Sequence, residues 1–189
     1  THQETRPRRS TPANRRFLAA LSLALVTGTA GADELLATSG PINPNLLTID
    51  PATGVVLSSL PISGEEALFG GLTLDGDVLY TIDGYNDPNS DRTFRIDPAT
   101  GIGTVVGNTT YNWHFRSVEI HPVTGALYAM RDNELYTLDK AGGAGSLVAP
   151  ITGSTLNQAT AFAIDLDGQF ALTDTGGQGL FALDLATGA

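Results

Sequence analysis

The stretch Thr-Phe-Arg-Ile-Asp-Pro-Ala-Thr-Gly at residues 93–101 decides the fold, because the chain contains it in four versions. The other versions are LLTIDPATG at 46–54, LYTLDKAGG at 135–143 and LFALDLATG at 180–188. Each is a short, largely apolar run that ends at an aspartate, with a glycine four residues later. Aspartate accepts backbone N–H bonds within a turn, proline after it presets φ, and glycine tolerates positive φ. The stretch therefore predicts a strand, a tight turn and an antiparallel return strand.

The turn aspartates recur every 42–47 residues, and two more families of short apolar runs keep the same spacing. These runs lie at 71–74, 117–120 and 161–164, and, directly after them, at 78–82, 126–130 and 169–173. One repeat therefore contains four short strands. A repeat of about 40–50 residues with four strands is typical of a β-propeller blade.

The repeat pattern, gLa-D-pxG-xLY-xxD followed by lyxIDpaTG-xxxxvG, resembles the repeats of secreted bacterial propellers near the WD40-like and NHL-type proteins. We expect an all-β propeller domain over 33–189, with four-stranded antiparallel blades. Complete blades are expected near 71–107 and 117–148, and partial blades at 34–60, without its innermost strand, and 161–184, without its outermost strand. This is an arc of about 3.5 blades, whereas a closed ring needs at least about four, so we expect a fragment of a longer protein. Its open strand edges would permit self-association.

The first 32 residues have the pattern of an export signal. Arg15 and Arg16 precede the apolar run 17–26, and Ala30-Gly31-Ala32 fits a signal-peptidase site. We expect a signal peptide at 1–32, by the general or the twin-arginine route, and a periplasmic or extracellular protein. The alternative is an amphipathic N-terminal helix of the fold, which the continuous apolar run disfavours. The chain has no cysteine, so the exported fold must hold without disulfides.

The charge of the chain argues against two classes of partner. Its formal net charge is −10, and half of its ten basic residues precede residue 33. The remainder is therefore strongly acidic and would repel nucleic acid and anionic membranes. We expect neither a nucleic-acid partner nor membrane insertion of the mature chain.

Two sets of loops vary most, those between the second and third strands of a repeat and those that join one repeat to the next. We expect both to lie on one face, and variable loops on a rigid scaffold commonly carry function. The richest is 108–116, with the only tryptophan of the chain. Aromatic, amide and guanidinium groups together suit recognition of a carbohydrate, a peptide or a protein. The predicted ligand-binding residues are Tyr111, Asn112, Trp113, His114, Arg116 and, on a neighbouring loop, Tyr85. The alternative is that Trp113 and Phe115 pack beneath the loop and seal the seam between blades.

Acidic residues at 83–91 suggest a possible Ca²⁺ site, since Asp83, Asp87 and Asp91 offer oxygen ligands. The stretch lacks the EF-hand pattern, and a polar turn is the alternative. No other cofactor is expected. No motif for a catalytic nucleophile, a phosphate loop or a dinucleotide site occurs. We expect an exported, non-catalytic binding module; the alternative is a metal-dependent hydrolase or lyase resembling the lactonase-like propellers.

Overall fold

The computed structural model describes residues 22–26, 34–39, 44–64, 69–83, 91–111, 115–152, 159–165, 167–168, 170–174 and 180–189. Every regular element in these ranges is a β-strand. The described residues contain no helix that is long and apolar enough to cross a membrane.

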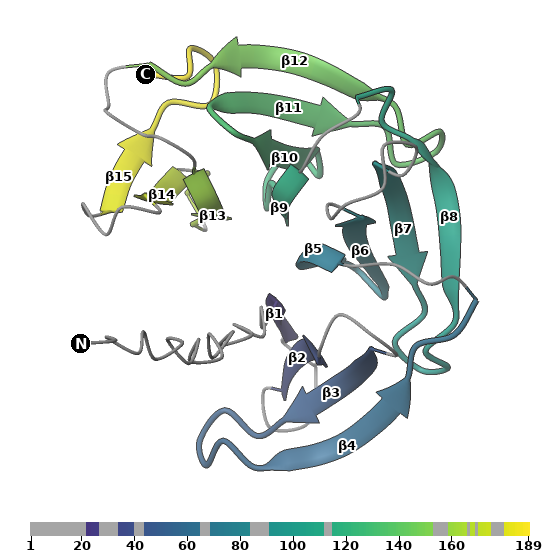
Figure 1. Ribbon diagram of the computed structural model, residues 1–189. Coiled ribbons are helices and arrows are strands. Elements are labelled where there is room, and N and C mark those ends of the chain that lie inside the picture. Colours follow the sequence, from purple (N-terminus) through teal and green to yellow (C-terminus); the bar gives the residue numbers. More distant parts are fainter. Residues whose placement is uncertain are drawn as a thin grey trace, which may run out of the picture.

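The strands form four antiparallel sheets in which neighbours in the sequence are neighbours in space. The sheets are β1–β4, β5–β8, β9–β12 and the three-stranded β13–β15. Figure 1 shows them side by side around an arc, with the first strand of each sheet toward the centre and the last toward the rim. The strand bounds are β1 Ser22–Val26, β2 Glu34–Ser39, β3 Asn45–Ile49, β4 Val56–Pro61, β5 Phe69–Asp75, β6 Val78–Asp83, β7 Arg92–Ile96, β8 Gly103–Asn108, β9 Phe115–Ile120, β10 Leu127–Arg131, β11 Glu134–Leu138, β12 Gly145–Pro150, β13 Ala159–Ile164, β14 Phe170–Asp174 and β15 Leu180–Leu183.

The first sheet differs from the sequence prediction, which gave it no innermost strand. Ser22–Val26 fills that position as β1 and pairs with β2 from Ser22↔Thr38 to Val26↔Glu34. A short apolar run suits both an inner strand and the core of a signal peptide, so periodicity could not separate the two. Export and cleavage after Ala32 stay predictions. Cleavage there would remove β1 and leave that edge of β2 to another strand.

The predicted turns are confirmed at the level of single hydrogen bonds. In the turn after β7, the Ala99 N–H donates to Asp97 Oδ1 at 2.8 Å and the Thr100 hydroxyl donates to Asp97 Oδ2 at 2.8 Å. Gly101 closes the turn with φ +71°. Because the hydroxyl and N–H groups favour the ionised carboxyl, the pKa of Asp97 lies below its usual value.

The hydrophobic core lies in the seams between sheets. The largest cluster joins sheets β5–β8 and β9–β12 through Tyr80, Ile82, Phe115, Val118, Leu127, Ala129, Tyr136 and Leu138. A second cluster, with Leu36 and Leu72, joins the first two sheets, and a third, with Met130 and Leu183, joins the last two. Each sheet therefore buries its faces against its neighbours, which fixes the loops at the sheet ends.

Candidate functional site

The candidate site lies where the chain leaves β8 and enters β9, beside the turn between β10 and β11. The Thr109 N–H donates to the Asp91 carbonyl at 2.8 Å, and the Gly145 N–H donates to the Thr109 carbonyl at 3.0 Å. Thr110 then adopts φ +69°, a left-handed conformation that sharply redirects the chain. These contacts anchor Tyr111 between two sheets.

Three aromatic rings form the centre of the site. The ring centroids of Tyr111 and Tyr136 are 4.7 Å apart, those of Phe115 and Tyr136 are 5.2 Å apart, and both pairs meet edge to face. Phe115 and Tyr136 are buried, whereas Tyr111 is only partly buried. The Phe115 ring thus packs in the seam between the two sheets. Trp113, which the packing alternative placed beside it, lies outside the described residues. Tyr111 is the ring of the cluster that keeps some access to solvent.

Charged groups from the β10–β11 turn surround the rings. The Arg131 guanidinium carbon lies 5.7 Å from the centroid of the Tyr111 ring, within cation–π range. Arg131 Nη1 and Glu134 Oε2 are 3.9 Å apart, and the Tyr136 hydroxyl donates to Glu134 Oε2 at 2.5 Å. Burial, and then the hydrogen bond to Glu134, raise the pKa of Tyr136 to about 12. Its hydroxyl therefore remains a donor at neutral pH and holds Glu134 in place.

The structure places only some of the predicted site residues. Tyr111 belongs to the aromatic cluster, and Arg116 is half-buried on β9, where the backbone passes close to Gly70 of β5. Asp91 is buried, and Asp83 ends β6. The remaining predicted residues lie outside the described residues: Asn112, Trp113, His114, Tyr85 and Asp87.

The ligand-binding and Ca²⁺ assignments of these residues stay predictions. The Tyr111 N–H donates to the Thr109 hydroxyl oxygen, and Thr109 in turn bonds the Asp91 carbonyl. Tyr111 and Asp91 are thus linked through Thr109, which hydrogen-bonds to both of them. Within the described ranges, no three His, Cys, Asp or Glu side chains gather in a way that could hold a metal ion.

The sequence analysis missed Arg131, Glu134 and Tyr136. A signal was available, because the two-residue turn Asp132-Asn133 makes Arg131 and Glu134 directly opposed cross-strand partners. Their approach to the Tyr111 loop depends on the packing of two sheets and is not visible in the local sequence.

Glu119 on β9 was also missed. Burial raises the pKa of its carboxyl to about 7, while a hydrogen bond with the Thr73 side chain partly opposes that rise. The Thr73 hydroxyl oxygen also accepts the Ile120 N–H at 3.0 Å, which ties inner strand β9 to inner strand β5. With this pKa, the Glu119 carboxyl is about half protonated near pH 7.

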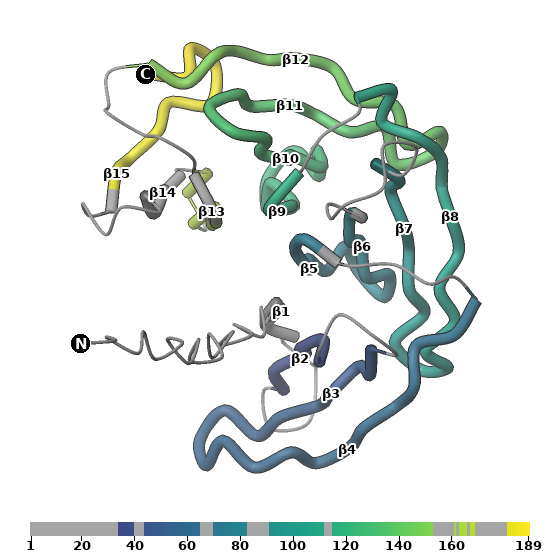
Figure 2. The backbone as a smooth tube through the Cα atoms, in the orientation of Figure 1, coloured from purple at the N-terminus to yellow at the C-terminus, as the bar shows by residue number. Residues whose placement is uncertain are grey.

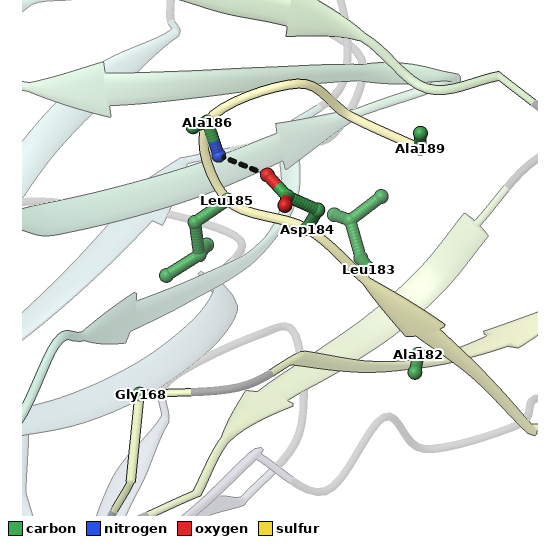
Figure 3. Close-up of a pocket in the computed structure, with 7 residues that line it drawn as sticks. All are labelled: Gly168, Ala182, Leu183, Asp184, Leu185, Ala186 and Ala189. Atoms are coloured by element: carbon green, nitrogen blue, oxygen red, sulfur yellow. Dashed lines mark hydrogen bonds between the residues drawn. The ribbon is translucent and has the colours of Figure 1, made fainter.

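A separate pocket lies at the last sheet (Figure 3), lined by Gly168, Ala182, Leu183, Asp184, Leu185, Ala186 and Ala189. Asp184 is its charged residue, and Asp184 Oδ1 accepts the Ala186 N–H at 2.8 Å. The carboxylate stabilises its own turn, as Asp97 does. Apart from Asp184, the pocket is therefore lined by glycine, alanine and leucine, and the Asp184 carboxylate is used within its own turn.

The sequence comparisons identify no relative: neither a protein-family model nor a curated protein matches the chain. Solved structures do match. A nidogen/laminin complex aligns with a TM-score of 0.63 and 18% identity, covering 88% of this chain and 60% of the matched chain. An auxiliary nutrient binding protein from Bacteroides thetaiotaomicron aligns with a TM-score of 0.61 and 15% identity, over 86% and 38%. The WD40 domain of Neurospora crassa Pan2 aligns at 0.50 and 14%, over 79% and 46%.

These similarities confirm the fold. The chain is an all-β protein whose antiparallel sheets match those of β-propeller proteins. It spans 60% and 38% of the first two matched chains. Identities of 14–18% are informative about the fold alone.

Proposed function

We propose that the protein is an exported, non-catalytic binding module that recognises a carbohydrate, peptide or protein partner. Its recognition surface is the loop end of the seam between sheets β5–β8 and β9–β12. One observation carries this proposal: a partly exposed Tyr111 ring is fixed by two buried rings and by the Arg131 guanidinium.

The chemistry of this surface suits binding. An aromatic ring next to a guanidinium and a carboxylate offers apolar contact together with donors and acceptors. Because these side chains already hold one another, less conformational entropy is lost when a partner binds. The structural likeness to a nutrient binding protein and to nidogen in its complex with laminin supports a binding role.

The test is a screen of the purified protein on a glycan array and a peptide library, followed by calorimetry of the hits. We expect Tyr111→Ala and Arg131→Gln to weaken the binding of a hit by about 10-fold or more. The matched control is Val123→Ser, because Val123 is 74% exposed in the β9–β10 turn, at the other end of the sheet. If the Tyr111→Ala and Arg131→Gln proteins bind a hit as tightly as the Val123→Ser protein does, the proposal is contradicted. An absence of hits in both libraries also contradicts it.

A further inference from the structure

Arg131 and Glu134 face each other across the tight turn that joins β10 to β11. Their charged groups are only loosely paired, because Arg131 Nη1 and Glu134 Oε2 are 3.9 Å apart, which is too long for a hydrogen bond. The two side chains have exposed fractions of 21% and 41%. A donor and an acceptor therefore lie side by side at the surface, and neither is fully satisfied by the other.

Glu134 has one carboxylate oxygen engaged and one available. The Tyr136 hydroxyl donates to Oε2 at 2.5 Å and stays protonated at neutral pH, since burial raises the pKa of Tyr136 to about 12. In the part of the chain that the structure describes, no donor bonds to Oε1. The bond from Tyr136 fixes the carboxylate, so Glu134 presents a positioned acceptor to a ligand.

Arg131 supplies donors beside this acceptor. Its guanidinium carbon lies 5.7 Å from the centroid of the Tyr111 ring, and its charge also acts on the Tyr136 hydroxyl, where it opposes the rise in pKa. Arg131 Nε is buried and has no hydrogen-bond partner among the described residues. A buried N–H without an acceptor lowers stability, so an oxygen that a ligand brings to this guanidinium is favourable.

The Tyr111 ring reaches this pair from the other side of the seam. The Gly145 N–H donates to the Thr109 carbonyl at 3.0 Å, and Figure 2 shows the backbone at the end of β8 approaching the sheet β9–β12. Tyr111 is partly buried, and Arg131 lies over its ring. The exposed part of the ring therefore offers a small apolar contact next to the donor and the acceptor.

We propose that the ligand of this surface is a neutral carbohydrate, recognised through two adjacent hydroxyl groups that bridge Glu134 and Arg131. One hydroxyl donates to Glu134 Oε1, its neighbour accepts from the Arg131 guanidinium, and C–H groups of the sugar ring contact Tyr111. The inference rests on the proposed function and narrows its ligand to one chemical class.

The chemistry of the pair favours a neutral ligand over a charged one. A hydroxyl both donates and accepts, so adjacent hydroxyls can satisfy a carboxylate and a guanidinium together. A carboxylate bound to Arg131 would also meet Glu134, and Asp132 lies in the same turn, whereas an amine bound to Glu134 would meet Arg131. Like charges brought together weaken binding, and the net charge of −10 adds a longer-range repulsion of anions.

A screen of the full-length protein against matched ligands tests the proposal. One array carries neutral oligosaccharides, the same oligosaccharides with uronic acid residues, and peptides. The best neutral glycan and its monodeoxy derivatives are then compared by calorimetry. We expect the neutral glycan to bind about 10-fold or more tighter than its uronic acid counterpart, and the loss of either of two adjacent hydroxyls to weaken binding by about 10-fold.

Glu134→Gln tests the acceptor from the side of the protein. It leaves one oxygen for both the Tyr136 hydroxyl and the ligand, so we expect about 10-fold weaker binding of the neutral glycan. The matched control is Asp77→Asn, which removes the same charge from an exposed position in the β5–β6 turn and should not change binding. Thermal melts of both variants show whether they remain folded, and the monodeoxy glycans need no substitution in the protein.

The outcomes separate this inference from the proposed function. If the hits are peptides or uronic acid glycans whose binding Tyr111→Ala weakens, the binding surface stands and the neutral sugar is overturned. A neutral glycan that binds the Glu134→Gln protein as tightly as the Asp77→Asn protein, or that tolerates the loss of each hydroxyl, also overturns it. If Tyr111→Ala weakens no hit, the proposed function fails and this inference fails with it.

Discussion

The turns at 50–54 and 97–101 have one sequence and one local structure but different surroundings. In the first, the Ala52 N–H and the Thr53 hydroxyl donate to the Asp50 carboxylate at 2.8 and 2.6 Å, as Ala99 and Thr100 do to Asp97 at 2.8 Å each. Both glycines have φ +71°. At the end of the first turn Gly54 is exposed, whereas Gly101 at the end of the second is buried against the end of β4. Local sequence therefore determines the turn, and the neighbouring sheet determines how much a substitution in it costs.

The largest effect of that difference is expected at Gly101. Gly101→Val should destabilise the protein by about 3–5 kcal/mol, since the new side chain meets positive φ and the Pro61 carbonyl together. Gly76→Val meets positive φ in open space and should lose about 1–2 kcal/mol. Urea unfolding of both variants measures the gap. Equal losses of stability in the two variants would mean that the end of β4 does not restrict the space at residue 101.

Glu119 and Asp97 extend the comparison to charge. Hydrogen bonds from the Thr100 hydroxyl and then the Ala99 N–H hold the pKa of Asp97 below its usual value of 3.8, whereas burial raises the pKa of Glu119 from 4.5 to about 7. The unfolded chain loses the Glu119 proton near pH 4.5 and the folded chain keeps it until about pH 7. The stability that Glu119 contributes is therefore present below pH 4.5 and is lost as the pH rises to 7.

Glu119→Gln should remove that loss. At pH 8 we expect the variant to be more stable than the parent by about 2–3 kcal/mol, and at pH 4 the two should be alike. Urea unfolding at several pH values measures the difference. Asp97→Asn is the opposing control, because its parent loses stability as the pH falls through the lowered pKa of Asp97. A Glu119→Gln gain in stability that does not change with pH would contradict the raised pKa of the Glu119 carboxyl.

Sequence reasoning found the repeat and its turns because each turn is stabilised by residues within five positions of one another. It failed at β1, where the same apolar run suits a signal peptide and an inner strand equally well. It also missed Arg131 and Glu119. Arg131 acts through Tyr111 of the preceding loop and Glu119 through Thr73 of another sheet, and such contacts across seams leave no local pattern.

A smaller effect tests whether the threonine hydroxyl stabilises the aspartate equally in the turns at 50–54 and 97–101. Thr53→Ala and Thr100→Ala each remove the hydroxyl that contributes most to lowering the pKa of the adjacent aspartate. We expect equal, small decreases in Tm and equal rises in the pKa of Asp50 and Asp97, measured by NMR titration. Unequal rises would show that the sheet over the second turn also controls its carboxylate.

The smallest effect is expected at His121, which takes the aspartate position in the turn after β9. Its Nδ1 accepts the Val123 and Thr124 N–H groups at 3.2 and 3.3 Å, whereas Asp184 Oδ1 accepts the equivalent pair at 2.8 and 2.9 Å. His121→Asp should therefore raise stability by about 0.5 kcal/mol, since bonds to a charged acceptor are shorter and stronger. His121→Ala removes the acceptor and should lower stability by about 1 kcal/mol. If both variants lose stability equally in thermal melts, the imidazole contributes through its packing, and hydrogen-bond acceptance at this position is not what stabilises the turn.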